Sequence, residues 1–156
     1  MRGITALILF ITMTTIAHAQ DAAKRLVGTW RLLDIKGGDG KMLPERGPRP
    51  TGLIYYDAAG NMAVQIQPDR PRPKWSGRSA TPEEAKESLI GYTAYFGTYK
   101  VDEKAGTVTH YRAGNITAGA PNVVVRRYEF VSPDRVILRP VESKNALTWE
   151  RVKPSH

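Results

Sequence analysis

Short segments rich in β-branched and aromatic residues recur along most of this chain, and turn-forming residues separate them. Asp57-Ala58-Ala59-Gly60 and Ser132-Pro133-Asp134 are typical of tight turns between strands. Because most connections are short, consecutive strands should pair antiparallel. We therefore predict eight strands, at residues 27–36, 51–57, 61–67, 91–102, 106–114, 122–131, 135–140 and 145–152.

Eight strands in sequence order predict an all-β fold, an up-and-down antiparallel β-barrel, because closure removes the exposed edges of an open sheet. One long interruption, from Pro68 to Ser88, separates the third strand from the fourth. Within it, Thr81, Pro82 and Glu84 have the pattern of an N-cap, a first helical residue and a capping box. We expect a short helix over 82–89, which either closes one end of the barrel or packs outside its wall.

The first 19 residues have the features of a secretion signal. Met1-Arg2 is a short positive start, Ile4 to Ile16 is largely apolar, and Ala17-His18-Ala19 fits the pattern that signal peptidase cleaves. We expect a signal peptide at 1–19 and one domain at 20–156, exported to the periplasm or secreted. The apolar run is shorter than the roughly 20 residues of a spanning helix, so we expect no membrane span.

The composition excludes several kinds of site. The chain has no cysteine, which excludes disulfides, thiol nucleophiles and cysteine zinc sites. After cleavage only His110 and His156 remain as histidines, and no phosphate loop or dinucleotide fingerprint is present. We therefore expect no metal and no cofactor. The net charge of +8 is spread along the chain without an aromatic-basic RNA-binding motif, so we expect no nucleic-acid partner.

Strand alternation assigns side chains to the two faces of the sheet. In the hairpin of the fourth and fifth strands, Tyr99 should lie opposite His110 and Val101 opposite Val108. In the hairpin of the sixth and seventh strands, Phe130 should oppose Val136 and Tyr128 should oppose Leu138. The interior face then carries six candidate ligand-binding residues: Tyr95, Tyr99, His110, Arg112, Arg126 and Tyr128.

Two arginines deserve separate interpretations. An inward Arg126 is costly unless it meets a carboxylate, a ligand anion or an aromatic face. Arg151 shares a side of the last strand with Trp149, and closure brings that strand beside Trp30. A basic side chain over the Trp30 ring would close that end of the barrel through a cation–π contact and hydrogen bonds to the chain. We therefore assign Gly28, Trp30, Trp149 and Arg151 to structure.

Several segments resemble a known family. Gly28-Thr29-Trp30 resembles the Gly-x-Trp signature of the lipocalins and the wider calycin group, whose Trp packs under a basic residue of the last strand. Further segments resemble the bacterial and fungal lipocalin-like domain family: 52–60, 94–102, 108–110, 126–130 and 147–151. The resemblance implies an antiparallel barrel with an interior cavity. Some fungal relatives of this barrel type are implicated in isomerisation or cyclisation.

Three functions remain open. The first is binding of a small hydrophobic or amphipathic ligand, an anionic one included, in the barrel. The second is an isomerase or cyclase in which His110 is the general base and Arg126 or Tyr99 stabilises an oxyanion. The third is a filled barrel, in which His110 bonds Tyr99 or Arg112 and the protein acts as a non-catalytic interaction module. Whether the protein is an enzyme stays open, as does any protein partner.

Overall fold

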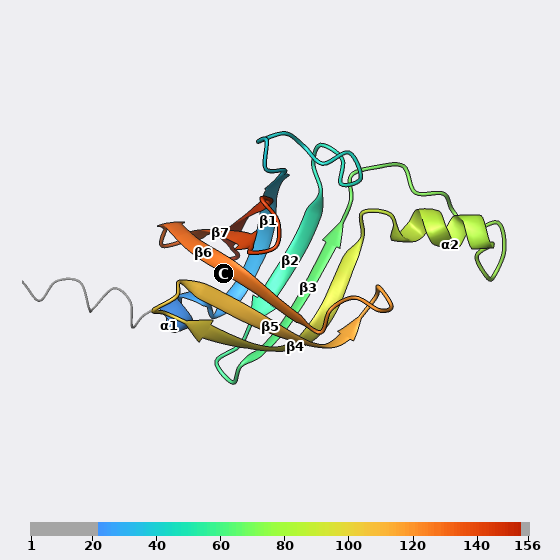
Figure 1. Cartoon of the computed structure of the whole chain (residues 1–156). Coiled ribbons are helices and arrows are strands. Elements are labelled where there is room, and N and C mark those ends of the chain that lie inside the picture. Colours follow the sequence, from blue (N-terminus) through green and yellow to red (C-terminus); the bar gives the residue numbers. More distant parts are fainter. Residues whose placement is uncertain (1–21, 154–156) are drawn as a thin grey trace, which may run out of the picture.

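The computed structural model describes residues 22–153, which form a closed barrel of eight antiparallel strands (Figure 1). The strands follow one another in sequence order, and the last pairs with the first. The predicted fold class is therefore confirmed. The elements are α1 (Ala22–Leu26), β1 (Gly28–Lys36), β2 (Thr51–Tyr56), β3 (Asn61–Gln67), α2 (Pro82–Leu89), β4 (Thr93–Asp102), β5 (Thr107–Asn115), β6 (Val123–Ser132), β7 (Arg135–Pro140) and β8 (Ala146–Arg151).

The register of the hairpins agrees with the prediction. Tyr99 lies opposite His110 in β4 and β5, and Tyr128 lies opposite Leu138 in β6 and β7. A bulge interrupts the β4–β5 ladder between Phe96 and Gly97. The bulge lies on the far side of Gly97 from the β4–β5 turn. The alternation of inward and outward side chains from Gly97 to Asp102 is therefore unaffected.

The core fills the barrel from all sides. Strand β3 shows the pattern most simply, because Met62, Val64 and Ile66 are buried while the residues between them are exposed. The largest fully buried side chains are those of Trp30, Trp149, Tyr56, Leu26, Ile54, Leu138 and His110. Alternation therefore directs the buried apolar side chains of the strands into one continuous core, while others, such as Leu53, Tyr55 and Phe96, remain exposed on the outer face.

Helix α1 was not predicted, and it covers one end of the barrel. Leu26 is fully buried, and its carbonyl oxygen accepts a hydrogen bond of 2.8 Å from the Trp30 indole Nε1. Figure 1 shows α1 beside β4, at the end where the β2–β3, β4–β5 and β6–β7 turns lie. We name this the closed end. The open end is the opposite one, where the connections 37–50, 68–92, 116–122 and 141–145 lie.

Helix α2 has the predicted bounds and the predicted capping box between Thr81 and Glu84. Its placement matches neither predicted alternative. None of its residues is buried, and Figure 1 shows it projecting beyond the strands on extended connections. An ion pair of 2.6 Å between Arg70 and Glu87 joins one of those connections to the helix.

Two predictions concern residues outside 22–153. The signal peptide at 1–19 and its cleavage site fall there, as does His156. Among the described residues, no helix is both long and apolar enough to span a bilayer.

Candidate functional site

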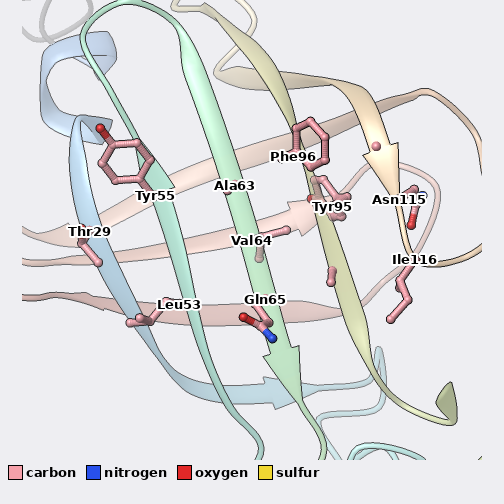
Figure 2. A pocket seen from close by; sticks show the side chains of 12 residues that line it. Thr29, Leu53, Tyr55, Ala63, Val64, Gln65, Tyr95, Phe96, Asn115 and Ile116 are labelled. Carbon is pink, nitrogen blue, oxygen red and sulfur yellow. The ribbon is translucent and has the colours of Figure 1, made fainter. Parts of the chain in front are cut away.

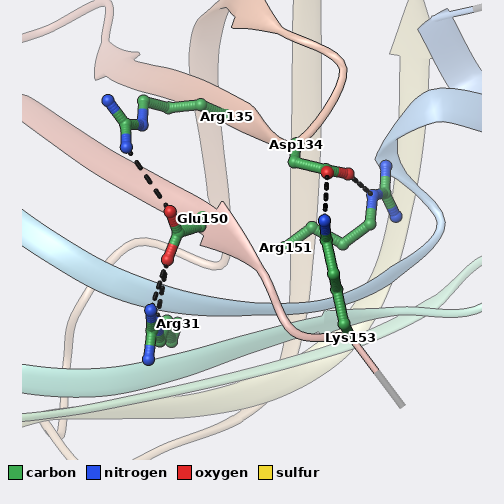
Figure 3. A network of polar contacts seen from close by, with 6 residues as sticks. All are labelled: Arg31, Asp134, Arg135, Glu150, Arg151 and Lys153. Atoms are coloured by element: carbon green, nitrogen blue, oxygen red, sulfur yellow. Dashed lines mark hydrogen bonds and ion pairs between the residues drawn. The ribbon is translucent and has the colours of Figure 1, made fainter.

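Arg151 links several segments of the chain at the closed end. Its guanidinium carbon lies 4.2 Å from the centroid of the Trp30 ring, the cation–π geometry that the sequence predicts. The same side chain donates hydrogen bonds of 2.8 Å to the Val27 carbonyl oxygen and 2.6 Å to the Arg25 carbonyl oxygen. Figure 3 shows its ion pair of 3.4 Å with Asp134. The donors of Arg151 therefore meet acceptors on two sides of the barrel end.

Gly28 makes room for this arginine. Its φ of 129° lies in the range that favours glycine, and a Cβ at this position would lie 2.8 Å from Nη1 of Arg151. Trp149, the fourth residue assigned to structure, is also buried but does not belong to this cluster. Its ring lines an interior cavity instead.

His110 lies at the centre of the barrel and is fully buried. Its Nε2 is 2.8 Å from the Tyr56 hydroxyl oxygen, and its Nδ1 is 2.9 Å from the Tyr95 hydroxyl oxygen. These partners replace Tyr99 and Arg112, which the filled-barrel interpretation named. Burial lowers the pKa of His110 well below its ordinary value, and the charges of Arg126 and Arg112 lower it further. His110 is therefore a neutral imidazole whose two nitrogens are both engaged.

Two predicted site residues lie toward the closed end. Tyr99 is half-buried, its hydroxyl donates a hydrogen bond of 2.7 Å to the Asp57 carbonyl oxygen, and its ring meets Tyr56 edge to face. Tyr128 packs against Phe130, with ring centroids 5.7 Å apart. These two side chains support the closed end.

The other predicted residues lie together on the open side of His110. Arg126 is half-buried, and its Nη2 donates a hydrogen bond of 3.2 Å to the Tyr95 hydroxyl oxygen. Arg112 stacks on the Tyr95 ring, 4.3 Å from its centroid, and donates a hydrogen bond of 3.1 Å to the Pro121 carbonyl oxygen. The six predicted residues thus form two groups on either side of His110.

A small interior cavity adjoins the Arg126 group. Its volume is about 10 Å³, roughly that of one water molecule. Apolar side chains form most of the wall, and the residues with polar side-chain atoms along it are Thr93, Tyr95, Arg126 and Trp149. The lining residues are Ile54, Val64, Ile66, Thr93, Tyr95, Arg126, Leu138, Leu147 and Trp149. The barrel is therefore nearly filled, and the space that remains lies toward its open end.

A larger groove, of about 720 Å³, lies on the outer face of β2, β3 and β4 (Figure 2). Exposed apolar side chains form its rim, among them Leu53, Tyr55, Phe96 and Ile116. Tyr95 is the single predicted site residue along it, and the Tyr95 side chain is buried. This groove was not expected from the sequence.

Sequence reasoning also missed Tyr56 and Arg46. Tyr56 could have been found through the β2–β3 hairpin, because it lies opposite Met62, which belongs to the apolar, inward face of β3. Arg46 lies in the 37–50 connection, where no periodicity assigns a direction to a side chain.

Within residues 22–153, no three His, Asp or Glu side chains cluster in a way that could hold a metal ion.

Comparison with known proteins gives one match to a family. The model of a family described as a lipocalin-like domain matches residues 27–153. Two solved structures are similar at 15% sequence identity. A redesigned β-barrel has a TM-score of 0.46, with 85% of this chain and 96% of that chain covered. A DUF4847 family protein from Bacteroides vulgatus has a TM-score of 0.42, with 83% and 96% covered. No curated protein matches the chain.

Proposed function

Because the chain belongs to the lipocalin-like domain family, we propose that it binds a small hydrophobic or amphipathic molecule inside its barrel, through the open end. The observation that carries this proposal is the inward guanidinium of Arg126. It borders the interior cavity, and its hydrogen-bond partner is a tyrosine hydroxyl. A half-buried charge held by one neutral group is costly unless it serves a ligand.

The cavity walls suit such a molecule. Ile54, Val64, Ile66, Leu138 and Leu147 offer an apolar surface, which supplies most of the contact area in small-molecule sites. Since the cavity holds only about one water molecule, the ligand must displace side chains at the open end. The 37–50 connection lies at that end and consists mostly of exposed residues, so a shift of this segment is one way to admit the ligand.

Binding without catalysis is the better interpretation of His110. A general base needs a lone pair within reach of substrate. Both ring nitrogens of His110 are engaged by tyrosine hydroxyls, and the ring is fully buried. We therefore assign His110 to the internal network.

Export from the cytoplasm is a separate proposal, and it is supported by the signal-like pattern of residues 1–19. N-terminal sequencing of the protein recovered from each cell fraction tests it. A periplasmic or secreted form that begins at Gln20 is expected. An uncleaved chain confined to the cytoplasm would contradict export.

The binding proposal is tested with the neutral fluorescent probe N-phenyl-1-naphthylamine and with native mass spectrometry of the purified protein. We expect saturable probe binding and a co-purified small molecule. Two neighbouring substitutions test the interior against the outer groove, because Val64 is buried and lines both, whereas Ala63 is exposed and lines only the groove. Val64→Phe should abolish probe binding, whereas Ala63→Phe should leave it unchanged.

Thermal unfolding of both variants verifies that they are folded, and Leu147→Phe serves as a second interior variant. If Ala63→Phe abolished binding and both interior variants retained it, the ligand site would be the outer groove. Absence of both probe binding and a co-purified molecule would favour the protein-interaction alternative.

A further inference from the structure

Unpaired hydrogen-bond donors gather in the open half of the barrel. Four buried side-chain atoms of the described residues lack a hydrogen-bond partner, and all four are nitrogen donors: Arg46 Nε, Arg112 Nε, Arg139 Nη1 and Trp149 Nε1. Three of them belong to residues around the interior cavity or its open end. Since buried polar groups are nearly always paired, this half of the molecule lacks an acceptor.

Trp149 provides the most informative of these donors. Its side chain is 1% exposed, its ring lines the cavity, and its indole N–H has no acceptor. An indole nitrogen can only donate. A buried tryptophan normally satisfies this donor, as Trp30 does with the Leu26 carbonyl oxygen. The Trp149 N–H therefore points to a ligand atom that accepts a hydrogen bond.

Arg46 brings a second guanidinium to the same place. It donates hydrogen bonds to the Gly91 carbonyl oxygen and, at 3.0 Å, to Oγ1 of Thr93, which itself lines the cavity. Burial lowers the pKa of Arg46, the exposed Glu45 raises it, and the charge of Arg126 lowers it. Two like charges thus act on each other across the cavity end, which is unfavourable without an anion between them.

No carboxylate of the described residues forms an ion pair with these arginines, and Glu45, which raises the pKa of Arg46, is itself exposed. The ion pairs within residues 22–153 include none of Arg46, Arg112 and Arg126. All eight engage arginines and lysines elsewhere. The open half therefore combines three guanidinium groups, an unpaired indole N–H and an apolar wall.

We infer that the polar end of the ligand is a carboxylate, bound by the guanidinium of Arg126 and the indole N–H of Trp149, with Arg46 closing over it. This inference rests on the proposed function and names its ligand class. A carboxylate carries two oxygens that match the planar fork of a guanidinium and accept a further donor. It is also the smallest common organic anion, which suits a cavity that must open from about one water volume.

The direct test compares carboxylates with their neutral amides in isothermal titration calorimetry of the full purified protein. Hexanoate and benzoate are the probes, and hexanamide and benzamide are their isosteres. We expect each carboxylate to bind at least about tenfold more tightly than its amide, because charge-assisted hydrogen bonds are the stronger ones. Arg126→Gln should remove this difference, and Arg46→Gln should reduce it.

The matched control is Arg127→Gln. Arg127 neighbours Arg126 on β6 but is exposed on the outer face, so it changes the net charge equally and should leave the ratio intact. Trp149→Phe removes the indole N–H and should weaken the carboxylate more than the amide. Thermal unfolding shows that each variant is folded.

The outcomes separate the two proposals. Amides that bind as tightly as carboxylates, or an Arg127→Gln effect equal to that of Arg126→Gln, would overturn the carboxylate inference while interior binding stands. Failure of both the acids and the neutral naphthylamine probe to bind would overturn interior binding itself, and the inference with it.

Discussion

The two ends of this barrel differ in how many partners their arginine side chains have. At the closed end, Arg151 has two backbone carbonyl acceptors, a carboxylate and the face of Trp30. At the open end, Arg126 has one tyrosine hydroxyl. A fully partnered arginine fixes the chain around it, whereas one with few acceptors keeps its donors available to a ligand. The difference separates a structural end of the molecule from the end at which we propose that the ligand binds.

The largest effect is expected from a substitution at the centre of the closed end. Trp30→Ala removes a fully buried indole from between α1 and the barrel. The free energy of unfolding should fall by about 3–5 kcal/mol, because the cavity left behind adds to the lost burial. Urea unfolding followed by circular dichroism measures it. Trp75→Ala is the control, since Trp75 is 54% exposed, and it should change stability by less than about 0.5 kcal/mol.

His110 marks the boundary between the ends, and its removal tests whether the network there is structural. His110→Leu removes the hydrogen-bond partner of the buried Tyr56 hydroxyl and one of the two partners of the Tyr95 hydroxyl, which Arg126 also contacts. We expect a loss of about 3 kcal/mol at pH 7, since each unsatisfied buried group costs about 1–3 kcal/mol. An unchanged free energy of unfolding would argue against a structural role.

The same substitution should alter the dependence of stability on pH. Because the folded pKa of His110 lies well below 6.5, the unfolded chain takes up a proton first as the pH falls. The contribution of His110 is therefore fully present above about pH 6.5 and declines below it, by up to about 1.4 kcal/mol per pH unit. The wild type should lose stability more steeply than His110→Leu between about pH 6.5 and 5. Parallel profiles would contradict the buried, neutral imidazole.

Exchanging each arginine for methionine compares the two ends directly. Arg151→Met should destabilise the fold by about 2 kcal/mol, because hydrogen bonds from a charged donor are lost. Arg126→Met should leave stability unchanged or raise it by up to about 1 kcal/mol, since it replaces a poorly compensated charge with an apolar side chain. Chemical unfolding of both variants in one buffer checks the contrast. Equal losses would mean that the two ends do not differ.

The smallest effect is expected on the outer surface. Figure 3 shows Glu150 between Arg31 and Arg135. Glu150→Gln should lower stability slightly at low ionic strength and have no effect in high salt, because exposed ion pairs are screened. Melting temperatures at two salt concentrations measure this. A loss that persisted in high salt would show that Glu150 supports the closed end by more than charge.

Most of the fold could be predicted because it depends on local patterns. Turn residues set the strand limits, which agree with the structure to within two residues, and alternation set the faces. Helix α1 could not be predicted, because the five residues Ala22–Leu26 are too few to show a periodic pattern. The placement of α2 could not be predicted either, because a capping box shows where a helix begins but not what it packs against.

The site could be predicted only in part. Alternation placed His110 and Arg126 inside the barrel, but it gives no depth along the barrel axis. Tyr99 and Tyr128 were therefore grouped with Arg126, although they lie toward the closed end. Arg46 reaches the cavity end from a connection whose path depends on tertiary contacts, such as its hydrogen bond to Thr93.

The pairing of β1 with β8 has a kinetic consequence. This ladder joins Trp30 to Arg151 and Lys36 to Ala146, so the two strands that seal the barrel lie almost a whole domain apart in the chain. Loop closure over such a separation is slow compared with hairpin formation. Until it occurs, β1 and β8 each present an unpaired edge on which another chain can add a strand. Refolding yield should therefore fall with rising protein concentration, even though the finished barrel has no edge to offer.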